Sequence, residues 1–335
     1  MNKKKESQGD IILSGMRPTG KLHIGHLSVL ENWARLQEEY RCYYFVANWH
    51  ALTTDYMDTS HIPENTQMML LDWLAAGLDP EKSSIFLQSH IKEHAELTLL
   101  LGMNIPLSWL ERVPTYKDQI LQLAKQGKDI NTYGFLGYPL LMAADIIVYR
   151  ANWVPVGEDQ GPHLEFSREL VRRFNYLYDR EVFPEPQPKF ARIATLPGID
   201  GRKMSKSYHN DIAISATPEE VMAQVKNMVT DPARIKKSDL GHPEICIVYK
   251  YQEIYNEAEA PEIKEACAGG KIGCVECKKR LAGCINAKLE PIREKRVYYE
   301  QRPELLKEIV AQGDQEAKAR AEETMKLVRE AMHLS

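Results

Sequence analysis

Long apolar runs are missing from this chain of 335 residues, and so is a strong excess of charge of either sign. No stretch approaches the roughly 18 apolar residues that a membrane helix needs, and the first six residues lack the apolar run of a signal peptide. We therefore expect a cytoplasmic protein without a membrane partner. The formal net charge of −4 argues against bulk nucleic-acid binding, although a local cluster of Lys and Arg can still attract a polyanion.

Cysteine is sparse as well, and internal repeats and low-complexity segments are absent. In the cytoplasm the six cysteines are better interpreted as thiols or metal ligands than as a disulfide framework. Hydrophobic residues at 44% and charged residues at 27% lie near globular averages, which excludes disordered and fibrous classes. The length allows a large core and predicts two domains.

Short apolar runs alternate with helical patterns over the first half of the chain, as is typical of a parallel, doubly wound sheet. Strands are expected at 10–13, 42–48, 84–88 and 153–156, and helices at 24–40, 64–76, 93–101, 134–151 and 160–176. After Ser207 strand signals nearly vanish, and Thr217 to Glu220 forms a capping-box pattern. The prediction is a Rossmann-type α/β domain over 1–207 and an α-helical domain over 208–335, whose last helix packs back on the first domain.

The first candidate motif is His23-Ile24-Gly25-His26, which follows a turn rich in Gly and Pro and opens a predicted helix. Three residues apart on a helix, the two imidazoles share one face beside free backbone N–H groups. A helix start of this kind suits a phosphate group. Taken alone, the pair is better explained as two ordinary surface histidines.

The second candidate motif is Lys203-Met204-Ser205-Lys206-Ser207, which lies in a predicted loop preceded by glycines. Two ammonium groups on a mobile loop can close on a triphosphate as charge builds up, which is binding specific to the transition state. A Lys-rich loop is usually only a solvated turn. A given pentapeptide, however, occurs by chance in about one chain in ten thousand of this length, so the match is specific.

In this order the two segments closely resemble the HIGH and KMSKS motifs of the class I aminoacyl-tRNA synthetases. Within that class the chain is similar to the tryptophanyl enzymes through its segments 47–53, 138–146, 154–160 and 291–296. The resemblance covers nearly the whole chain. It implies a Rossmann catalytic domain, a helical anticodon-binding domain and a homodimer that joins L-tryptophan to tRNA with ATP and Mg²⁺.

The mechanism that follows is attack of the tryptophan carboxylate on the α-phosphorus of ATP, with no covalent enzyme intermediate. Four residues are predicted to stabilise the developing charge without acting as acids or bases: His23, His26, Lys203 and Lys206. The resemblance further predicts a set of ATP-binding residues. They are Arg17, Pro18, Thr19, Gly25, His26, Gly157, Glu158, Asp159, Ile193, Lys203, Met204, Ser205, Lys206 and Ser207.

Two of these assignments carry more detail. Asp159 is the natural partner of the ribose hydroxyls, and the backbone near Ile193 would receive the adenine. Arg17 departs from the Gln that is common in bacterial tryptophanyl enzymes, and its charge would add a phosphate contact.

A pocket for tryptophan needs one hydrogen-bond acceptor, because the indole ring offers only an N–H donor. Asp145 lies in an otherwise apolar helical segment, where a carboxylate without a partner is costly. One hypothesis is that Asp145 accepts the indole N–H, as the matching family position does. The alternative is a pair between Asp145 and a nearby cation such as Arg150.

Other pocket residues are predicted by the resemblance. Met142, Val154 and Val156 would form the apolar walls, although all three also suit ordinary core positions. Gln160 would hold the ammonium or carboxylate group of the substrate. His50 would line the same cavity or serve as a core or capping residue.

Four of the cysteines are spaced as C-x20-C-x6-C-x2-C: Cys246, Cys267, Cys274 and Cys277. Glycines between them predict a loop that wraps a metal, and four thiolates fit either zinc or a 4Fe-4S cluster. Four unligated thiols are the alternative. Some tryptophanyl synthetases carry a 4Fe-4S cluster on similar spacing, and this resemblance favours iron-sulfur, with zinc as the runner-up. Cys42 and Cys284 are interpreted as packing residues.

Two basic runs, 278–280 and 293–296, would serve a tRNA partner or form solvated helix faces. We hypothesise that the cysteine site orders the first run for the anticodon. The nearest rival function is a tyrosyl-tRNA synthetase, which shares both motifs but must satisfy a phenolic O–H. Another HIGH-type nucleotidyltransferase would lack the helical domain, and a non-catalytic paralogue would not need both lysines and both histidines.

Overall fold

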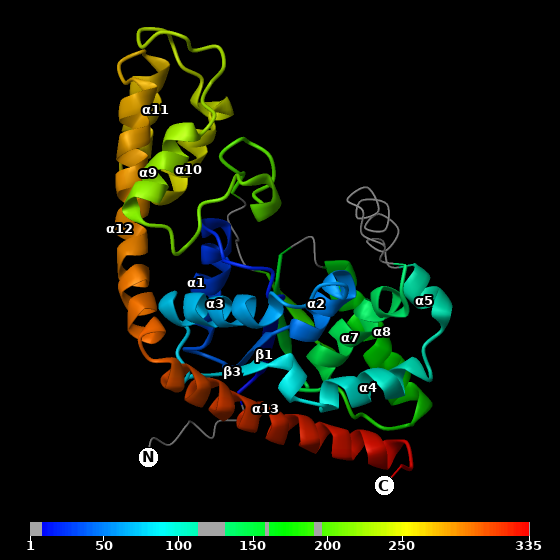
Figure 1. Cartoon of the computed structure of the whole chain (residues 1–335). Coiled ribbons are helices and arrows are strands. Elements are labelled where there is room, and N and C mark those ends of the chain that lie inside the picture. The colour runs from blue at the N-terminus through cyan, green and yellow to red at the C-terminus, as the bar shows by residue number, and fades with distance from the viewer. Residues whose placement is uncertain (1–8, 113–130, 158–160, 191–195, 335) are drawn as a thin grey trace.

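A parallel sheet of five strands forms the centre of the computed structural model, which describes residues 9–112, 131–157, 161–190 and 196–334 (Figure 1). The strands run in the order β3-β2-β1-β4-β5. Their bounds are β1 (Ile11–Met16), β2 (Arg41–Val46), β3 (Ser83–Leu87), β4 (Trp153–Val156) and β5 (Gln187–Phe190). The predicted doubly wound α/β fold is confirmed, while β5 is an addition that the sequence analysis did not predict.

Helices cover both faces of the sheet, because alternate residues of β1 and β2 point to opposite sides. Ile12 packs with α1 (Leu27–Leu36) and α3 (Ile62–Ala75), whereas Leu13 packs with the helices of the other face. That other face carries α4 (Glu93–Gly102), α7 (Tyr133–Ile147) and α8 (Gly161–Leu177). Two shorter helices, α2 (Asn48–Asp55) and α5 (Leu107–Glu111), pack on α7.

Three short 3-10 turns carry residues of the site. The HIGH motif consists of the N-cap His23 and the turn η1 (Ile24–His26) directly before α1, a second turn, η2 (Gln88–His90), follows β3, and a third, η4 (Lys206–Tyr208), begins in the KMSKS motif. The turns η1 and η2 follow the carboxyl ends of the parallel strands β1 and β3, which is where open α/β sheets place their ligands.

The second half of the chain is helical, as predicted, with α9 (Pro218–Asn227), α10 (Ile247–Tyr255), α11 (Ala260–Ala268), α12 (Cys274–Glu300) and α13 (Pro303–Ala331). The capping box that the sequence predicts is present, since Thr217 and Glu220 bond reciprocally at the start of α9. In Figure 1 the 27 residues of α12 descend from these helices along α3 to the sheet. No helix in the described ranges is long and apolar enough to cross a membrane.

The last helix, α13, lies along the edge strand β3. Asp314 accepts a hydrogen bond from the backbone N–H of Leu87 at 3.2 Å, and Ser84 donates to Glu316 at 2.6 Å. Gly313 stands where a Cβ atom would lie only 1.9 Å from the carbonyl oxygen of Ile85. The helix thus covers the open edge of the sheet, a position that would otherwise invite pairing with another chain.

Two arginines of the basic run 293–296 make internal contacts with other parts of the chain. Arg296 is 9% exposed and donates to Asp72 on α3 at 2.7 Å. The other oxygen of Asp72 accepts the backbone N–H of Leu22, next to the HIGH motif, at 3.1 Å. Arg293 donates to the carbonyl of Ala216 at 2.7 Å. A buried Arg that bonds a carboxylate is an internal contact and is not free for tRNA.

Candidate active site

A cavity of about 500 Å³ opens at the carboxyl ends of β1 and β4. The strand order reverses between these two strands, so the cavity occupies the switch point of the sheet, the usual ligand position in this class of fold. Seven of the predicted site residues line it: Arg17, His50, Met142, Asp145, Val154, Val156 and Gly157. The structure therefore brings together, in one cavity, the described residues that are predicted to bind tryptophan.

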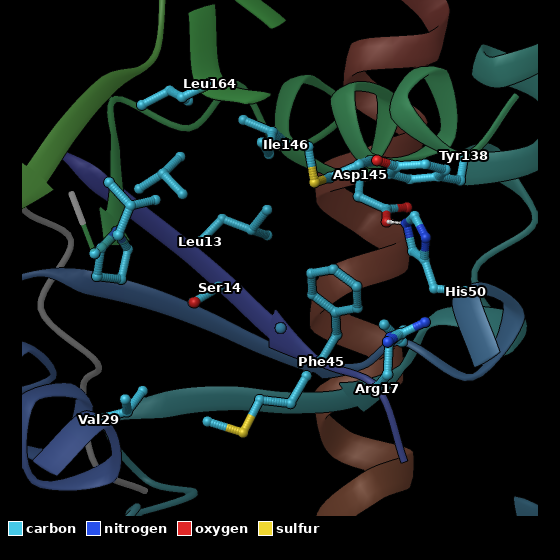
Figure 2. Close-up of a pocket in the computed structure, with 18 of the residues that line it drawn as sticks. Leu13, Ser14, Arg17, Val29, Phe45, His50, Tyr138, Asp145, Ile146 and Leu164 are labelled. Atoms are coloured by element: carbon cyan, nitrogen blue, oxygen red, sulfur yellow. Dashed lines mark hydrogen bonds and ion pairs between the residues drawn. The ribbon is translucent and has the colours of Figure 1, made fainter. Parts of the chain in front are cut away.

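Asp145 is the polar centre of this cavity and is 1% exposed (Figure 2). Its Oδ1 atom lies 2.6 Å from Nδ1 of His94, and its Oδ2 atom lies 2.9 Å from Nε2 of His50. Gln88 donates to both oxygens, at 2.8 and 2.9 Å. Arg150, the alternative partner, is not among the donors that the described part of the chain supplies.

Burial opposes ionisation of Asp145, but the positive character of His94 and the hydrogen bonds from His50 and His94 outweigh it and hold the pKa of the carboxyl below its usual value. Asp145 is therefore an anion in a largely apolar cavity. Gln88 and His94 were not among the site residues predicted from the sequence. The position of Gln88 just after β3, at the carboxyl edge of the sheet, is the signal that could have found it.

Aromatic rings complete the walls of the cavity. Phe45, Phe135 and Tyr138 line it in addition to the predicted Met142 and Val154. In Figure 2 Phe45 and Tyr138 come from different sides toward the region of Asp145. A flat apolar ring with one hydrogen-bond donor matches this combination of surfaces.

The two motif histidines lie side by side, with ring centroids 3.8 Å apart. Burial, followed by the positive charge of Lys206, lowers the pKa of His23 to about 4. Burial, then His23 and Lys206, lowers the pKa of His26 to about 3. The backbone N–H of His23 donates to Nδ1 of His26 at 3.2 Å, so neutral His26 carries its proton on Nε2. That N–H is available to a phosphate oxygen.

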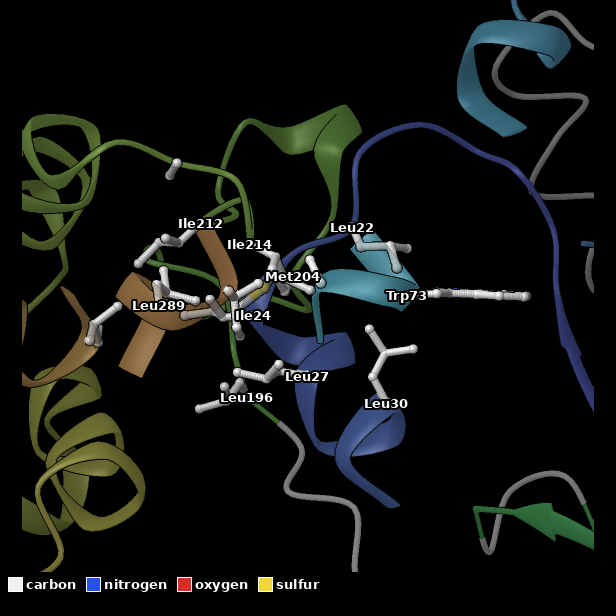
Figure 3. Packing of buried hydrophobic residues seen from close by; sticks show 14 of the residues in the cluster. Leu22, Ile24, Leu27, Leu30, Trp73, Leu196, Met204, Ile212, Ile214 and Leu289 are labelled. Carbon is white, nitrogen blue, oxygen red and sulfur yellow. The ribbon is translucent and has the colours of Figure 1, made fainter. Parts of the chain in front are cut away.

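The KMSKS segment closes onto the first motif. The Lys206 ammonium donates to the carbonyl oxygen of Thr19 at 3.1 Å, and burial lowers its pKa although Asp211 and Asp72 oppose the shift. Met204 is 7% exposed and packs beside Leu22 and Ile24 in the core (Figure 3). Its side chain therefore anchors the loop, and any contact between Met204 and ATP falls to its backbone.

The other predicted ATP-binding residues differ in their exposure. Lys203 and Thr19 are exposed, whereas Pro18 is buried. Gly25 allows a close approach, since a Cβ atom there would lie 3.0 Å from the ring of His23. Glu158, Asp159, Gln160 and Ile193 lie outside the described residues, as does the side chain of Ser207.

Asn210 is a loop-positioning residue that the sequence analysis missed. It is 2% exposed and accepts the backbone N–H of Ser205 at 2.8 Å. Its amide donates to Asp200 at 2.8 Å and to the carbonyl of Lys203 at 3.2 Å. The bonds to Ser205 and Lys203 fix the backbone on both sides of Met204.

The four candidate metal ligands come from three helices. Cys246 is the N-cap of α10, Cys267 lies in α11, and Cys274 and Cys277 lie in the first turn of α12. The prediction of a wrapping loop is wrong for the CxxC pair, because Gly273 ends the loop as the N-cap of α12. In the described ranges no three His, Cys, Asp or Glu side chains are arranged to hold a metal ion.

The four thiols nevertheless lie close enough to interact electrostatically. Burial raises the pKa of Cys277 to about 11, a hydrogen bond from Gln252 opposes this, and the three other cysteines raise it further. Gln252 lies 3.4 Å from the sulfur of Cys277, and the Arg234 guanidinium lies 3.4 Å from the sulfur of Cys267. The four thiols therefore share one neighbourhood that also contains N–H donors.

Comparison with known proteins places this geometry in a family. The family model for tRNA synthetases class I (W and Y) matches residues 5–290. The chain belongs to this family. Two motifs at the carboxyl edge of a parallel sheet are consistent with the class I fold.

Individual proteins similar to this class I synthetase match it over nearly their whole length. It is 52% identical over 327 residues to a tryptophan–tRNA ligase of Thermotoga maritima, covering 96% of this chain and 99% of that protein. It is 43% identical to a tryptophan–tRNA ligase of Ralstonia nicotianae, covering 97% and 98%. A solved Campylobacter jejuni tryptophanyl-tRNA synthetase, complexed with ADP and tryptophan, superposes with a TM-score of 0.87 at 32% identity, over 97% of this chain and all of that one.

Proposed function

We propose that this class I synthetase activates L-tryptophan with ATP and transfers the tryptophanyl group to tRNA. The observation that carries the proposal is the ionised Asp145 in an otherwise apolar, aromatic cavity, because the indole N–H needs one acceptor and no donor. The tryptophan–tRNA ligases among its relatives support the same amino acid. Family membership leaves tyrosine as the rival substrate.

In the proposed reaction the tryptophan carboxylate attacks the α-phosphorus of ATP, and pyrophosphate leaves. His26 and His23 are neutral, so they donate N–H groups to phosphate oxygens without repelling Lys206. Lys206 and the exposed Lys203 stabilise the charge that develops on the leaving group. Mg²⁺ enters with ATP as its counter-ion. The activated tryptophan then passes to the terminal ribose of tRNA.

Exchange of labelled pyrophosphate into ATP tests the amino acid. We expect L-tryptophan to support exchange at least about a hundredfold better than L-tyrosine, since a site built around one polar contact rejects ligands that mismatch it. Omission of any amino acid is the blank, and charging of tRNA by the same preparation tests the second step. Faster exchange with tyrosine would identify the chain as a tyrosyl enzyme.

We also propose that the four cysteines hold a 4Fe-4S cluster, with zinc as the alternative. Three sulfurs belong to helix N-terminal residues, where the helix dipole favours a thiolate, and Arg234 and Gln252 offer N–H donors to two of the sulfurs. Hydrogen bonds of this kind tune and stabilise sulfur ligands. When bound, such a group would lock together α10, α11 and α12.

The basic surface beside these thiols supports a role in tRNA binding. Arg234, Lys236, Lys237 and Lys271 line a cavity of about 780 Å³ together with Cys274. Lys278 is held by the carbonyls of Lys226 and Met228, at 2.8 and 2.7 Å. The proposed site would order these cations for the anticodon.

Substitution of the proposed cysteine ligands distinguishes a 4Fe-4S cluster from zinc and from a site without metal. The Cys274→Ser and Cys277→Ser double variant, prepared without oxygen, is expected to lose iron and visible absorption, whereas Cys284→Ser on the same helix retains both. It should lose tRNA charging while retaining pyrophosphate exchange. Zinc without visible absorption in the unsubstituted protein would favour the alternative metal, and absence of both metals would refute the site. Equal loss of exchange and charging would instead indicate a general folding role.

A homodimer is the assembly that we propose. Large apolar side chains are exposed on α2, α4, α5 and α7, which pack together. They include Leu52, Tyr56, Leu99, Met103, Leu107 and Tyr133. Exposed apolar surface of this kind marks interaction sites, and sedimentation velocity measures the assembly directly.

A further inference from the structure

A second layer of buried polar residues lies behind Asp145. His94 and Tyr149 are both 0% exposed. Nε2 of His94 lies 2.7 Å from the hydroxyl of Tyr149, and its Nδ1 lies 2.6 Å from Oδ1 of Asp145. Asp145 and His50 line the cavity, whereas His94 and Tyr149 are not among its lining residues in the described part of the chain. These two side chains therefore act on a ligand only through Asp145.

The direction of the hydrogen bonds along this chain follows from the chemistry of the groups. An ionised carboxylate only accepts, so Nδ1 of His94 must carry the proton that faces Asp145. Burial raises the pKa of Tyr149 well above its usual value, so its hydroxyl remains protonated and can donate to Nε2. With that bond in place, Nε2 of His94 accepts from Tyr149 while Nδ1 donates to Asp145. The opposite tautomer would aim a lone pair at the carboxylate.

His50 marks the side of the carboxylate that faces the cavity. His94 occupies Oδ1, Gln88 is shared between both oxygens, and His50 reaches Oδ2 from the cavity wall. These three donor groups make four contacts to the two oxygens, so a ligand N–H shares a lone-pair site with one of the donors. Oδ2, whose histidine partner His50 lines the cavity, is the atom that we assign to the substrate.

We propose that Tyr149 and His94 are positioning residues that fix the charge and orientation of Asp145, and thereby select an amino acid whose ring carries an N–H. This proposal rests on the activation of tryptophan argued above. Neither residue touches the substrate. Loss of the Tyr149 hydroxyl would free the imidazole to change tautomer, and the carboxylate would lose its fixed orientation.

The test compares two Tyr→Phe substitutions in pyrophosphate exchange. The substrates are tryptophan and β-(3-benzothienyl)alanine, in which sulfur replaces the indole N–H. Tyr149→Phe is expected to raise KM for tryptophan about tenfold, the size of one charge-assisted hydrogen bond, with kcat and the KM of the analogue changed less than about twofold.

Tyr43→Phe is the matched control. Its ring stacks on that of Tyr149 with centroids 5.2 Å apart, and its buried hydroxyl has no hydrogen-bond partner among the described residues. It should leave both substrates unaffected. Similar behaviour of the two variants, or an equal loss with tryptophan and the analogue, would overturn the positioning role.

A second pair of variants keeps the test decisive if Tyr149→Phe is unstable. His94→Asn retains an amide N–H near the place of Nδ1, whereas His94→Leu does not. We expect the first to retain preference for tryptophan over the analogue and the second to lose it, and equal loss in both would refute the proposal. An unsubstituted enzyme that fails to use tryptophan would instead overturn the proposed function.

Discussion

Asp145→Asn is expected to lower kcat/KM for tryptophan by about a thousandfold, roughly 4 kcal/mol of transition-state stabilisation. The asparagine keeps the volume of the side chain but replaces one acceptor oxygen with an N–H₂ group. His94 contacts Oδ1 and His50 contacts Oδ2, so the new N–H₂ group points either at a histidine N–H or at the indole N–H. Two donors then face each other, and neither finds an acceptor. Pyrophosphate exchange at varied tryptophan concentration measures the loss.

Two controls separate this loss from a general disturbance of the pocket. Met142→Leu changes the apolar wall at nearly constant volume, and we expect it to cost less than about tenfold. The benzothienyl analogue lacks the N–H that Asp145 accepts, so Asp145→Asn should affect it much less than tryptophan. Equal losses with both substrates would mean that Asp145 has a structural role only.

Gly313→Ala is expected to destabilise the protein by at least about 3 kcal/mol, although alanine is ordinarily the better helix former. The added Cβ atom would lie 1.9 Å from the carbonyl oxygen of Ile85 and 2.6 Å from its carbonyl carbon. Backbone atoms of a strand cannot rotate away as a side chain can. The helix α13 must therefore shift off β3, and the bond from Leu87 to Asp314 lengthens with it.

Gly283→Ala is the matched control for this prediction. Gly283 lies on the exposed side of α12, and a Cβ atom there has nothing within 4 Å. We expect it to stabilise the protein by about 0.5–1 kcal/mol, because alanine restricts the unfolded chain. Thermal unfolding followed by circular dichroism compares the two variants. A Gly313→Ala variant as stable as the unsubstituted protein would mean that α13 does not pack closely on β3.

Most elements of the fold were predictable, because strand and helix periodicities are local properties of the sequence. The four predicted strands and the capping box at Thr217 are present where expected to within a few residues. The strand β5 was missed, since Gln187-Pro188-Lys189-Phe190 is short, contains proline and stands at the sheet edge, where such residues are tolerated. The helical start of the CxxC pair was missed because the neighbouring glycines suggested a loop.

The candidate site also has a part that the sequence predicts and a part that it does not. Chemistry that resides in single residue types could be recognised without a structure: the two motifs, the one acid in an apolar segment, and the four thiols. Their partners could not. His94 lies 51 positions from Asp145, and Lys206 lies 187 positions from Thr19.

Local sequence thus yielded the candidate groups for the proposed reaction, through motif spacing and the scarcity of polar residues in apolar segments. Only tertiary packing decided that His50, His94 and Gln88, and not Arg150, surround Asp145, and that Arg296 joins α12 to Asp72 near the HIGH motif. The physical reason is that such contacts depend on how whole helices and strands pack together. No pattern within one segment specifies which distant side chain will satisfy a buried charge.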